Sequence, residues 1–163
     1  MVRKYAVIDL ETTGPKYESG DRIFQFGCTL IDGDEVIEHV SLNINPEKSI
    51  PFEIQLLTGV TNADVATAPY FDEVAMTIFN LLEDRTLVAH NVGFDGPFIM
   101  SALTDALGLE LEVPLIDTVQ LAQICYPTAL SYRLSDLTEA LEIRHTQVHT
   151  AGSDALATAE LFL

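Results

Sequence analysis

The stretch VIDLETTG, residues 7–14, decides the fold of this chain, because an apolar run ends there in two acids and a sharp turn. Residues 4–10 are predicted to form a buried strand, since most are apolar and several are β-branched. Residues i and i+2 of a strand point to the same face, so Asp9 and Glu11 project together. Two carboxylates this close repel each other unless a cation lies between them. The pair favours a hard divalent cation such as Mg²⁺ or Mn²⁺, and a solvated strand end is the simpler alternative.

The composition is that of a single globular domain. The chain has 163 residues, of which 48% are hydrophobic and 20% are charged, so it can bury a full core and is not disordered. No apolar run approaches the roughly 18 residues of a membrane helix, and the first residues lack the apolar segment of a signal peptide. Cys28 and Cys125 are far apart and outside any CxxC motif, so free thiols in a reducing cytoplasm are expected.

The net charge restricts how the chain can bind nucleic acid. Against 25 acids there are only 8 Lys and Arg residues, which gives a net charge of −17. Such a surface repels polyanions, so a broad basic clamp is absent. Contact with phosphate would then depend on bound metal, backbone N–H groups and a few local bases, or on another domain. The alternative is a substrate other than nucleic acid.

The order of predicted elements is typical of an α/β domain with a mixed sheet. Two further strands, 22–31 and 35–44, follow the first and are joined by a DGD hairpin turn at 32–34. An alanine stripe in the last helix, at residues 151, 155 and 159, suits close packing on a sheet. The remaining predicted elements are short helical pieces within 50–67, a helix at 71–82, a strand at 86–89, a helix at 93–107 with Gly108 as its C-cap, a strand at 115–116, and helices at 117–125, 134–141 and 150–163.

Three further acids lie where predicted strands end or helices begin. Asp95 falls in the first turn of a helix, where an acid is also simply a good partner for the helix dipole. Asp117 is most simply an N-cap. His149 and Asp154 are five residues apart, so both face one side if His149 lies just before the last helix. A structural or exposed histidine is the simpler alternative for His149.

The acids acquire a chemical meaning in combination. The carboxylates of Asp9, Glu11, Asp95 and Asp154 could hold two divalent ions about 4 Å apart. One ion would lower the pKa of a bound water, and the other would stabilise the leaving oxygen. A neutral His149 nearby could take the proton from that water. This is the equipment for hydrolysing a phosphodiester.

Three segments resemble the motifs of a known family. DLETTG at 9–14, NVGFD at 91–95 and HTAGSDA at 149–155 are similar to the three motifs of the DEDDh (DnaQ-like) 3′→5′ exonucleases. SYRLSDL at 131–137 and LTGVT at 57–61 are also similar to stretches of this family. Within the family, the chain resembles the proofreading epsilon subunit of bacterial DNA polymerase III and, most of all, the N-terminal exonuclease domain of Gram-positive DinG-type helicases.

The resemblance implies a fold and a set of residue roles. Residues 1–163 would form one exonuclease domain with an RNase H-like fold, in which helices flank a mixed central sheet. Metal ligands would be Asp9, Glu11, Asp95 and Asp154, with His149 as general base. The implied substrate-binding residues are Thr12, Thr13, Gly14, Leu57, Thr58, Gly59, Asn91 and Phe94. Composition alone instead places Leu57 and Phe94 in the core.

Two neighbouring positions qualify this likeness. Gln25 occupies a strand position where many relatives carry Glu, which puts a possible outer acid in doubt without affecting the ligand set. His90 lies at the end of a predicted buried strand and is expected to support the sheet.

The expected function is a 3′→5′ exonuclease that uses two Mg²⁺ or Mn²⁺ ions to release nucleoside 5′-monophosphates from single-stranded DNA. One alternative is an exoribonuclease or oligoribonuclease, since no residue decides whether a ribose 2′-OH is accepted. Another is a catalytically idle nucleic-acid-binding module of a helicase, against which all five chemical positions are filled. The last helix has no ending signal, so a fragment of a longer chain is expected, in which a helicase module or polymerase and repair machinery holds the strand.

Overall fold

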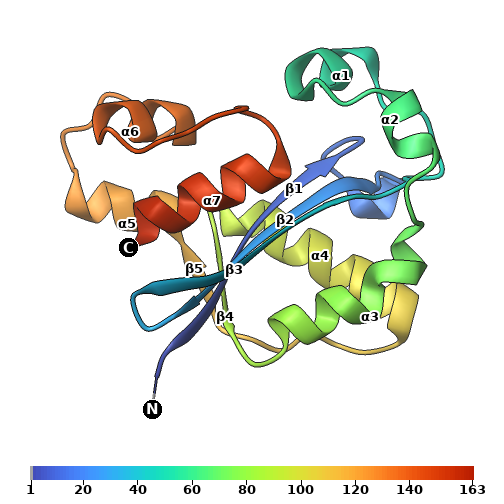
Figure 1. Cartoon of the computed structure of the whole chain (residues 1–163), viewed down its shortest axis with the longest axis horizontal. Helices are drawn as coiled ribbons and strands as arrows, with labels where there is room; N and C mark the ends of the chain where they lie inside the picture. Colours follow the sequence, from blue (N-terminus) through green and yellow to red (C-terminus); the bar gives the residue numbers. More distant parts are fainter. Residues whose placement is uncertain (1) are drawn as a thin grey trace.

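A computed structural model describes residues 2–163 as an α/β fold built on one mixed sheet (Figure 1). The strands lie in the order β3-β2-β1-β4-β5. The first three form an antiparallel meander, whereas β4 and β5 run parallel to β1. The strand bounds are β1 (Lys4–Thr12), β2 (Ile23–Asp32), β3 (Glu35–Asn43), β4 (Thr86–Ala89) and β5 (Leu115–Asp117). The predicted mixed sheet is therefore confirmed.

The helices fall close to the predicted ranges. They are α1 (Phe52–Thr58), α2 (Asn62–Ala66), α3 (Phe71–Leu82), α4 (Val92–Leu107), α5 (Thr118–Cys125), α6 (Leu134–Ala140) and α7 (Ala151–Phe162). A short 3₁₀ turn, η1 (Tyr17–Ser19), lies between β1 and β2, outside the predicted elements. β1 is two residues longer than predicted, because Glu11 and Thr12 still pair with β2. None of the helices in residues 2–163 is long and apolar enough to cross a membrane.

The two faces of the sheet are covered by different helices. Ile8 and Phe26 belong to a core cluster that includes Ile78 of α3 and Ile99 of α4. On the opposite face, Val7 lies in a smaller cluster with Ala159 of α7 and two other buried residues. Burial on both faces explains why β1 reads as a nearly continuous apolar run. Because strand residues alternate, Asp9 and Glu11 lie on the same face as Val7, which is the face of α7.

Small residues let α7 approach the sheet closely. A Cβ added at Gly27 of β2 would overlap the backbone carbonyl of Ala151. A Cβ at Gly152 would lie 2.6 Å from the Oγ of Ser41 on β3. The predicted alanine stripe is fully buried at its three positions, so close packing on the sheet is confirmed. Since Gly27 pairs with Asp9, this contact brings the start of α7 beside the acids of β1.

A β-bulge anchors α1 and α2. Thr12 pairs with Ile23 and Glu11 pairs with Gln25, which leaves Phe24 as the extra residue. The ring of Phe24 is fully buried in a cluster of its own with Ile50, Val60 and Val65, which flank or belong to these short helices. In Figure 1, α1 and α2 accordingly lie beyond the tip of β1, at the end of the sheet that carries the acids.

Candidate active site

Three carboxylates meet at the end of β1. Asp9 and Glu11 come from that strand, and Asp154 comes from the first turn of α7. One oxygen of each lies within 4.8 Å of one oxygen of each of the others. Asp9 and Glu11 are half-buried, and Asp154 is buried. The prediction that Asp9 and Glu11 share a face is confirmed, and the fold adds Asp154 to the pair.

The fourth predicted acid lies beside this cluster. Asp95 is buried in the first turn of α4, and its Oδ1 accepts the backbone N–H of Leu10 at 3.1 Å. This hydrogen bond ties α4 to β1 between Asp9 and Glu11. The negative charge of Asp95 is one of the causes that raise the pKa of Asp9, so the two carboxylates act on one another electrostatically.

Burial and mutual repulsion raise the pKa values of these acids. Desolvation is the main cause for Asp9, whose pKa lies well above its ordinary value, with further increases from Asp95, Glu11 and Asp154. Desolvation, and then the charges of Asp154 and Asp95, raise the pKa of Glu11 to about 8. Desolvation also raises the pKa of Asp95 to about 7, although the Leu10 N–H opposes it.

One oxygen in this cluster has no partner. Asp9 Oδ2 is buried and makes no hydrogen bond to any described residue. A buried acceptor of this kind costs free energy unless something pairs with it. Hard divalent cations prefer carboxylate oxygens, and they neutralise the repulsion that raises these pKa values. The donor set therefore fits one or more divalent metal ions.

Two histidines of the segment 141–150, which joins α6 to α7, reach Asp154 in different ways. The Nε2 of His145 lies 2.7 Å from Asp154 Oδ1, and its Nδ1 lies 3.2 Å from the Oγ1 of Thr138. His149 donates only its backbone N–H to the same oxygen, at 3.2 Å, and its residue is exposed. The predicted proximity of His149 to Asp154 thus holds for the backbone, while the imidazole in contact with the acid belongs to His145.

No motif pointed to His145. Its nine-residue separation from Asp154 corresponds to no helical or strand period, because the intervening chain turns back on itself. The available sequence signal was a second histidine in the segment that precedes the last helix.

The threonines predicted to bind substrate use their hydroxyl groups internally. Thr12 Oγ1 donates to the carbonyl of Gly14 at 2.7 Å, and Thr13 Oγ1 accepts the N–H of Arg22 at 3.0 Å. Thr58 Oγ1 donates to the carbonyl of Ile54 at 2.8 Å. All three threonines are buried. These hydroxyl groups shape the turn after β1 and the end of α1, where Gly59 forms the C-cap.

The other predicted substrate-binding residues are exposed to different extents. Leu57 is 55% exposed on α1, so its expected place in the core is wrong, because α1 is a short helix that buries its opposite side. Phe94 is half-buried, with its ring 5.5 Å from that of Phe98. Asn91 is exposed, has a φ of 74°, and donates its backbone N–H to Asp117 Oδ1. Asp117 also accepts the N–H of Val119, which confirms it as an N-cap.

Gln25 of β2 caps the first turn of α7, which packs on the same face of the sheet. Its Oε1 accepts the N–H of Ala151 at 3.2 Å, and its Nε2 donates to Asn43 Oδ1 at 2.9 Å. Thr150, the N-cap residue itself, makes no capping side-chain bond. A glutamate could accept from Ala151 in the same way, but it could not donate to Asn43.

His90 ties the end of β4 to the segment before α6. Its ring nitrogens lie 2.8 Å from Thr118 Oγ1 and 2.6 Å from the carbonyl of Tyr132. These contacts join α5 and the segment before α6 to the end of β4, so the part of its expected role that concerns the sheet stays a prediction.

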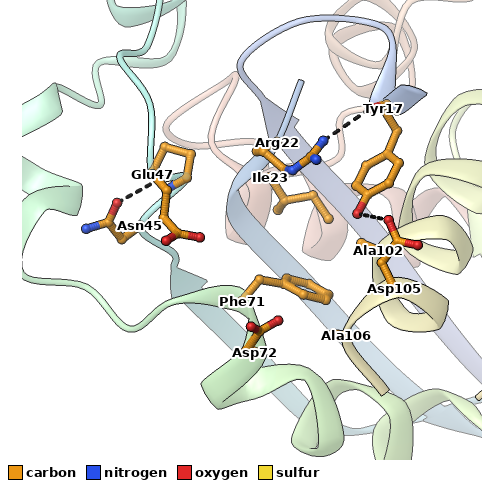
Figure 2. Close-up of a pocket in the computed structure, with 11 residues that line it drawn as sticks. Tyr17, Arg22, Ile23, Asn45, Glu47, Phe71, Asp72, Ala102, Asp105 and Ala106 are labelled. Atoms are coloured by element: carbon orange, nitrogen blue, oxygen red, sulfur yellow. Dashed lines mark hydrogen bonds between the residues drawn. The ribbon is translucent and has the colours of Figure 1, made fainter. Parts of the chain in front are cut away.

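A separate pocket of about 110 Å³ lies between η1, β2, α3 and α4 (Figure 2). The guanidinium of Arg22 lies 4.3 Å from the ring centre of Tyr17, whose hydroxyl donates to Asp105 at 2.8 Å. Phe71 and Asp72 of α3 form the opposite wall. None of the predicted site residues lines this pocket, so the acidic cluster is a distinct feature.

A family model now adds to this geometry. The model for the exonuclease family that includes RNase T matches residues 6–162. The chain therefore belongs to this exonuclease family, as the three motifs predicted. It is 41% identical over 162 residues to the 3′-5′ exonuclease DinG of Bacillus subtilis (strain 168), a match that covers 99% of this chain and 17% of that protein.

Solved structures share the fold at lower identity. The chain matches E. coli exonuclease I in complex with a dT13 oligonucleotide with a TM-score of 0.85 at 22% identity, covering 98% of this chain and 40% of that one. It matches a 3′-exonuclease that recognises the histone mRNA stem-loop with a TM-score of 0.80 at 16% identity, covering 99% and 62%. These likenesses confirm the RNase H-like exonuclease fold.

Proposed function

We propose that this domain is a metal-dependent 3′→5′ exonuclease that releases nucleoside 5′-monophosphates from single-stranded DNA. The observation that carries the proposal is the convergence of Asp9, Glu11 and Asp154, with Asp95 beside them, around a buried carboxylate oxygen without a partner. Membership of the exonuclease family supports phosphodiester hydrolysis as the reaction.

The four acids would hold two divalent ions, Mg²⁺ or Mn²⁺. Asp9, Glu11 and Asp154 have oxygens close enough to share one ion, and Asp95 is the neighbour of Asp9 that would help to hold a second. When bound, two such ions neutralise charge on the phosphate and lower the pKa of a water. The acids themselves hold the ions, and their raised pKa values mean that protons compete with metal at neutral pH.

His149 is the proposed general base. A neutral imidazole takes a proton effectively near its ordinary pKa, which lies close to working pH. Its backbone N–H donates to Asp154 Oδ1, and the residue is exposed to solvent. The ring would turn toward the attacking water when a strand is bound.

The terminal nucleotide would lie between the turn after β1 and the end of α1. The backbone of Thr12, Thr13 and Gly14 would border one side of the nucleotide, and Thr58 and Gly59 at the end of α1 would border the other. The remaining contacts would come from Leu57, Asn91 and Phe94. Leu57 offers an exposed apolar side chain, and Phe94 offers a half-buried ring.

An exoribonuclease is the second candidate. One structural neighbour is in complex with a dT13 oligonucleotide, and another recognises an mRNA stem-loop, so the shared fold is compatible with either nucleic acid. The 2′-OH group distinguishes the two substrates chemically.

Strand affinity would come largely from outside this domain. With 25 acids and 8 Lys and Arg residues, the domain has little positive charge to offer phosphates. The chain spans 17% of the length of its B. subtilis relative. We propose that a second module holds the strand, either a helicase module of the same chain or polymerase and repair machinery. The proposed setting is cytoplasmic, where Cys28 and Cys125 remain free thiols.

The test uses single-stranded DNA and RNA of one sequence, labelled at the 3′ or the 5′ end. With Mn²⁺ or Mg²⁺, the 3′ label should appear at once as a mononucleotide, while the 5′ label should pass through a ladder of shortening products. Excess chelator should stop hydrolysis, and added metal should restore it. Full activity in chelator would exclude the metal mechanism, and immediate release of the 5′ label would exclude the polarity. A higher kcat/KM on RNA would favour the second candidate.

A further inference from the structure

His145 is a buried link between α6 and α7. Its side chain is only 4% exposed, and both ring nitrogens have partners. Nε2 lies 2.7 Å from Asp154 Oδ1 on α7, and Nδ1 lies 3.2 Å from Thr138 Oγ1 on α6. Thr138 is itself buried, and its Oγ1 also lies 3.0 Å from the carbonyl oxygen of Ser135. The imidazole of His145 therefore connects Thr138 of α6 with Asp154, a proposed metal ligand.

The contacts made by His145 give the Asp154 carboxylate an orientation. Both protein hydrogen bonds of this carboxylate end on Oδ1: one joins it to His145 Nε2, and the backbone N–H of His149 donates the other. Within residues 2–163, Oδ2 has no recorded hydrogen bond, so this oxygen remains available to an ion. A hydrogen bond to one oxygen of a metal-binding carboxylate fixes its rotation and the direction of the other oxygen.

The position of α7 does not determine this rotation. Gly27 and Gly152 set how closely the helix approaches the sheet, and Gln25 holds its first N–H group. These contacts fix the backbone of α7, and with it the Cα of Asp154. These residues fix no torsion of the Asp154 side chain directly, because none of them forms a hydrogen bond with its carboxylate. Among the described residues, His145 is the one whose side chain does.

We propose that His145 is a positioning residue of the metal centre, which holds Asp154 so that one carboxylate oxygen faces the ions. This inference rests on the proposed function, because it assumes that Asp154 is a metal ligand. It assigns different roles to two histidines that lie four residues apart. In this assignment His149 takes the proton as general base, whereas His145 acts through Asp154 and contacts neither the nucleic acid nor the attacking water.

The test measures metal affinity directly, without substrate. His145→Phe keeps an aromatic ring of similar size and removes both nitrogens, whereas His145→Gln keeps an amide donor. Titration of Mn²⁺ followed by electron paramagnetic resonance should show about 10–100-fold weaker binding for His145→Phe, the usual loss when an outer partner of a metal ligand is removed. His145→Gln should recover most of that loss. Thr158→Val is the matched control, because it changes a buried hydroxyl without a partner on the same helix and should leave the affinity unchanged.

A second measurement separates positioning from simple structural support. The activity lost in His145→Phe should recover as the Mn²⁺ concentration rises, while His149→Ala should gain nothing from extra metal. If His145→Phe does not fold, Thr138→Val removes the other ring contact and should weaken Mn²⁺ binding by about threefold or more.

The outcomes against this proposal are distinct from those against the proposed function. A folded His145→Phe protein whose Mn²⁺ affinity stays within about twofold of the parent would overturn the positioning role alone. An unchanged affinity in Thr138→Val would do the same where His145→Phe is unfolded. A parent protein that binds no Mn²⁺ would overturn the metal centre, and with it both proposals.

Discussion

The end of β1 and the segment 141–150 present their chemical groups in different ways. Asp9 and Glu11 are held by the sheet, where Asp9 pairs with Gly27 and Glu11 pairs with Gln25. The segment 141–150 instead contains residues with left-handed backbone conformations, with φ values of 57° at residue 142, 49° at residue 147 and 65° at residue 149. Such conformations cost free energy and persist only where neighbouring contacts impose them. The strand therefore places its acids by continuous backbone pairing, whereas the segment combines a few backbone turns with contacts to side chains.

This difference indicates which functional groups tolerate change. Groups on the strand keep their positions when a neighbouring side chain is altered, because the backbone hydrogen bonds remain. Groups on the segment should move more readily when one contact is lost, such as the contact between His145 and Asp154 or the bond from Ser153 Oγ to the carbonyl of Thr146. The proposed metal ligands of β1 should accordingly keep their positions when a neighbouring side chain is changed, whereas the proposed base should move more easily.

The largest expected effect is at the strand. Asp9→Asn removes the charge of a proposed metal ligand without changing the shape of the side chain. We expect it to lower kcat/KM by roughly 10³-fold or more, comparable to the loss of a group that stabilises charge in a transition state. Asp34→Asn is the control, since it removes an exposed acid from the hairpin at the other end of β2. Initial rates on a labelled strand measure both variants, and equal losses would mean that overall charge matters more than the site.

The next effect concerns the proposed base. His149→Ala should lower kcat by about 10²–10⁴-fold, because it removes general-base assistance. Its Mn²⁺ affinity should match that of the parent, since its backbone N–H remains on Asp154. Val148→Ala, a neighbouring change in the same segment, should retain activity. A His149→Ala protein with the parent rate would remove this residue from the mechanism. The proposed catalytic groups would then be the acids alone, without a base from the segment 141–150.

A smaller effect concerns stability and pH in the metal-free protein. Folding raises the pKa of Glu11 from its ordinary value of 4.5 to about 8, so the folded state binds more protons than the unfolded chain across this window. Stability must then be highest below pH 4.5 for this group and fall as the pH rises toward 8. A change of about 1 kcal/mol in the free energy of unfolding moves the Tm of a domain of this size by roughly 2–4 °C. We therefore expect the Tm to fall by about 5 °C or more between pH 4.5 and pH 8.

Thermal melts in chelator and in Mn²⁺ would test this slope. Mn²⁺ should abolish the decrease, because it binds the ionised acids. Asp9→Asn should flatten the slope without metal, because it removes a second carboxyl whose pKa is raised by folding. A Tm that is independent of pH between 4.5 and 8 in chelator would show that folding does not raise the pKa values of the acids of β1.

The smallest effect is expected at Gln25, whose side chain on β2 caps the start of α7. Gln25→Ala removes the acceptor for the first N–H of α7 and should destabilise the protein by about 0.5–2 kcal/mol, as other lost caps do. Activity at saturating Mn²⁺ should change little, because Gly27 and Gly152 still seat the helix. Asn43→Ala, which removes only the second partner of Gln25, is the control for denaturant melts. Equal destabilisation by both variants would argue against a capping role.

Much of the fold could be predicted because it depends on local rules. Period-2 alternation placed Asp9 and Glu11 on one face, and this holds in the structure. The DGD turn predicted the β2–β3 hairpin, and Gly108 ends α4 with a φ of 65°, as a C-cap glycine does. The motif likeness added the expectation that Asp95 and Asp154 lie near Asp9, which no periodicity contains.

The amino-acid sequence by itself determined the elements, the acids at the end of β1 and the membership of the exonuclease family. Only the tertiary structure decided which histidine touches Asp154, that Gln25 caps α7 and that Leu57 is exposed. The reason is physical: the cap joins residues 126 positions apart, and the bond between Leu10 and Asp95 spans 85 positions. Contacts of this range arise only after the sheet and its helices have packed, and hydrophobic periodicity reports on neighbours within a few residues.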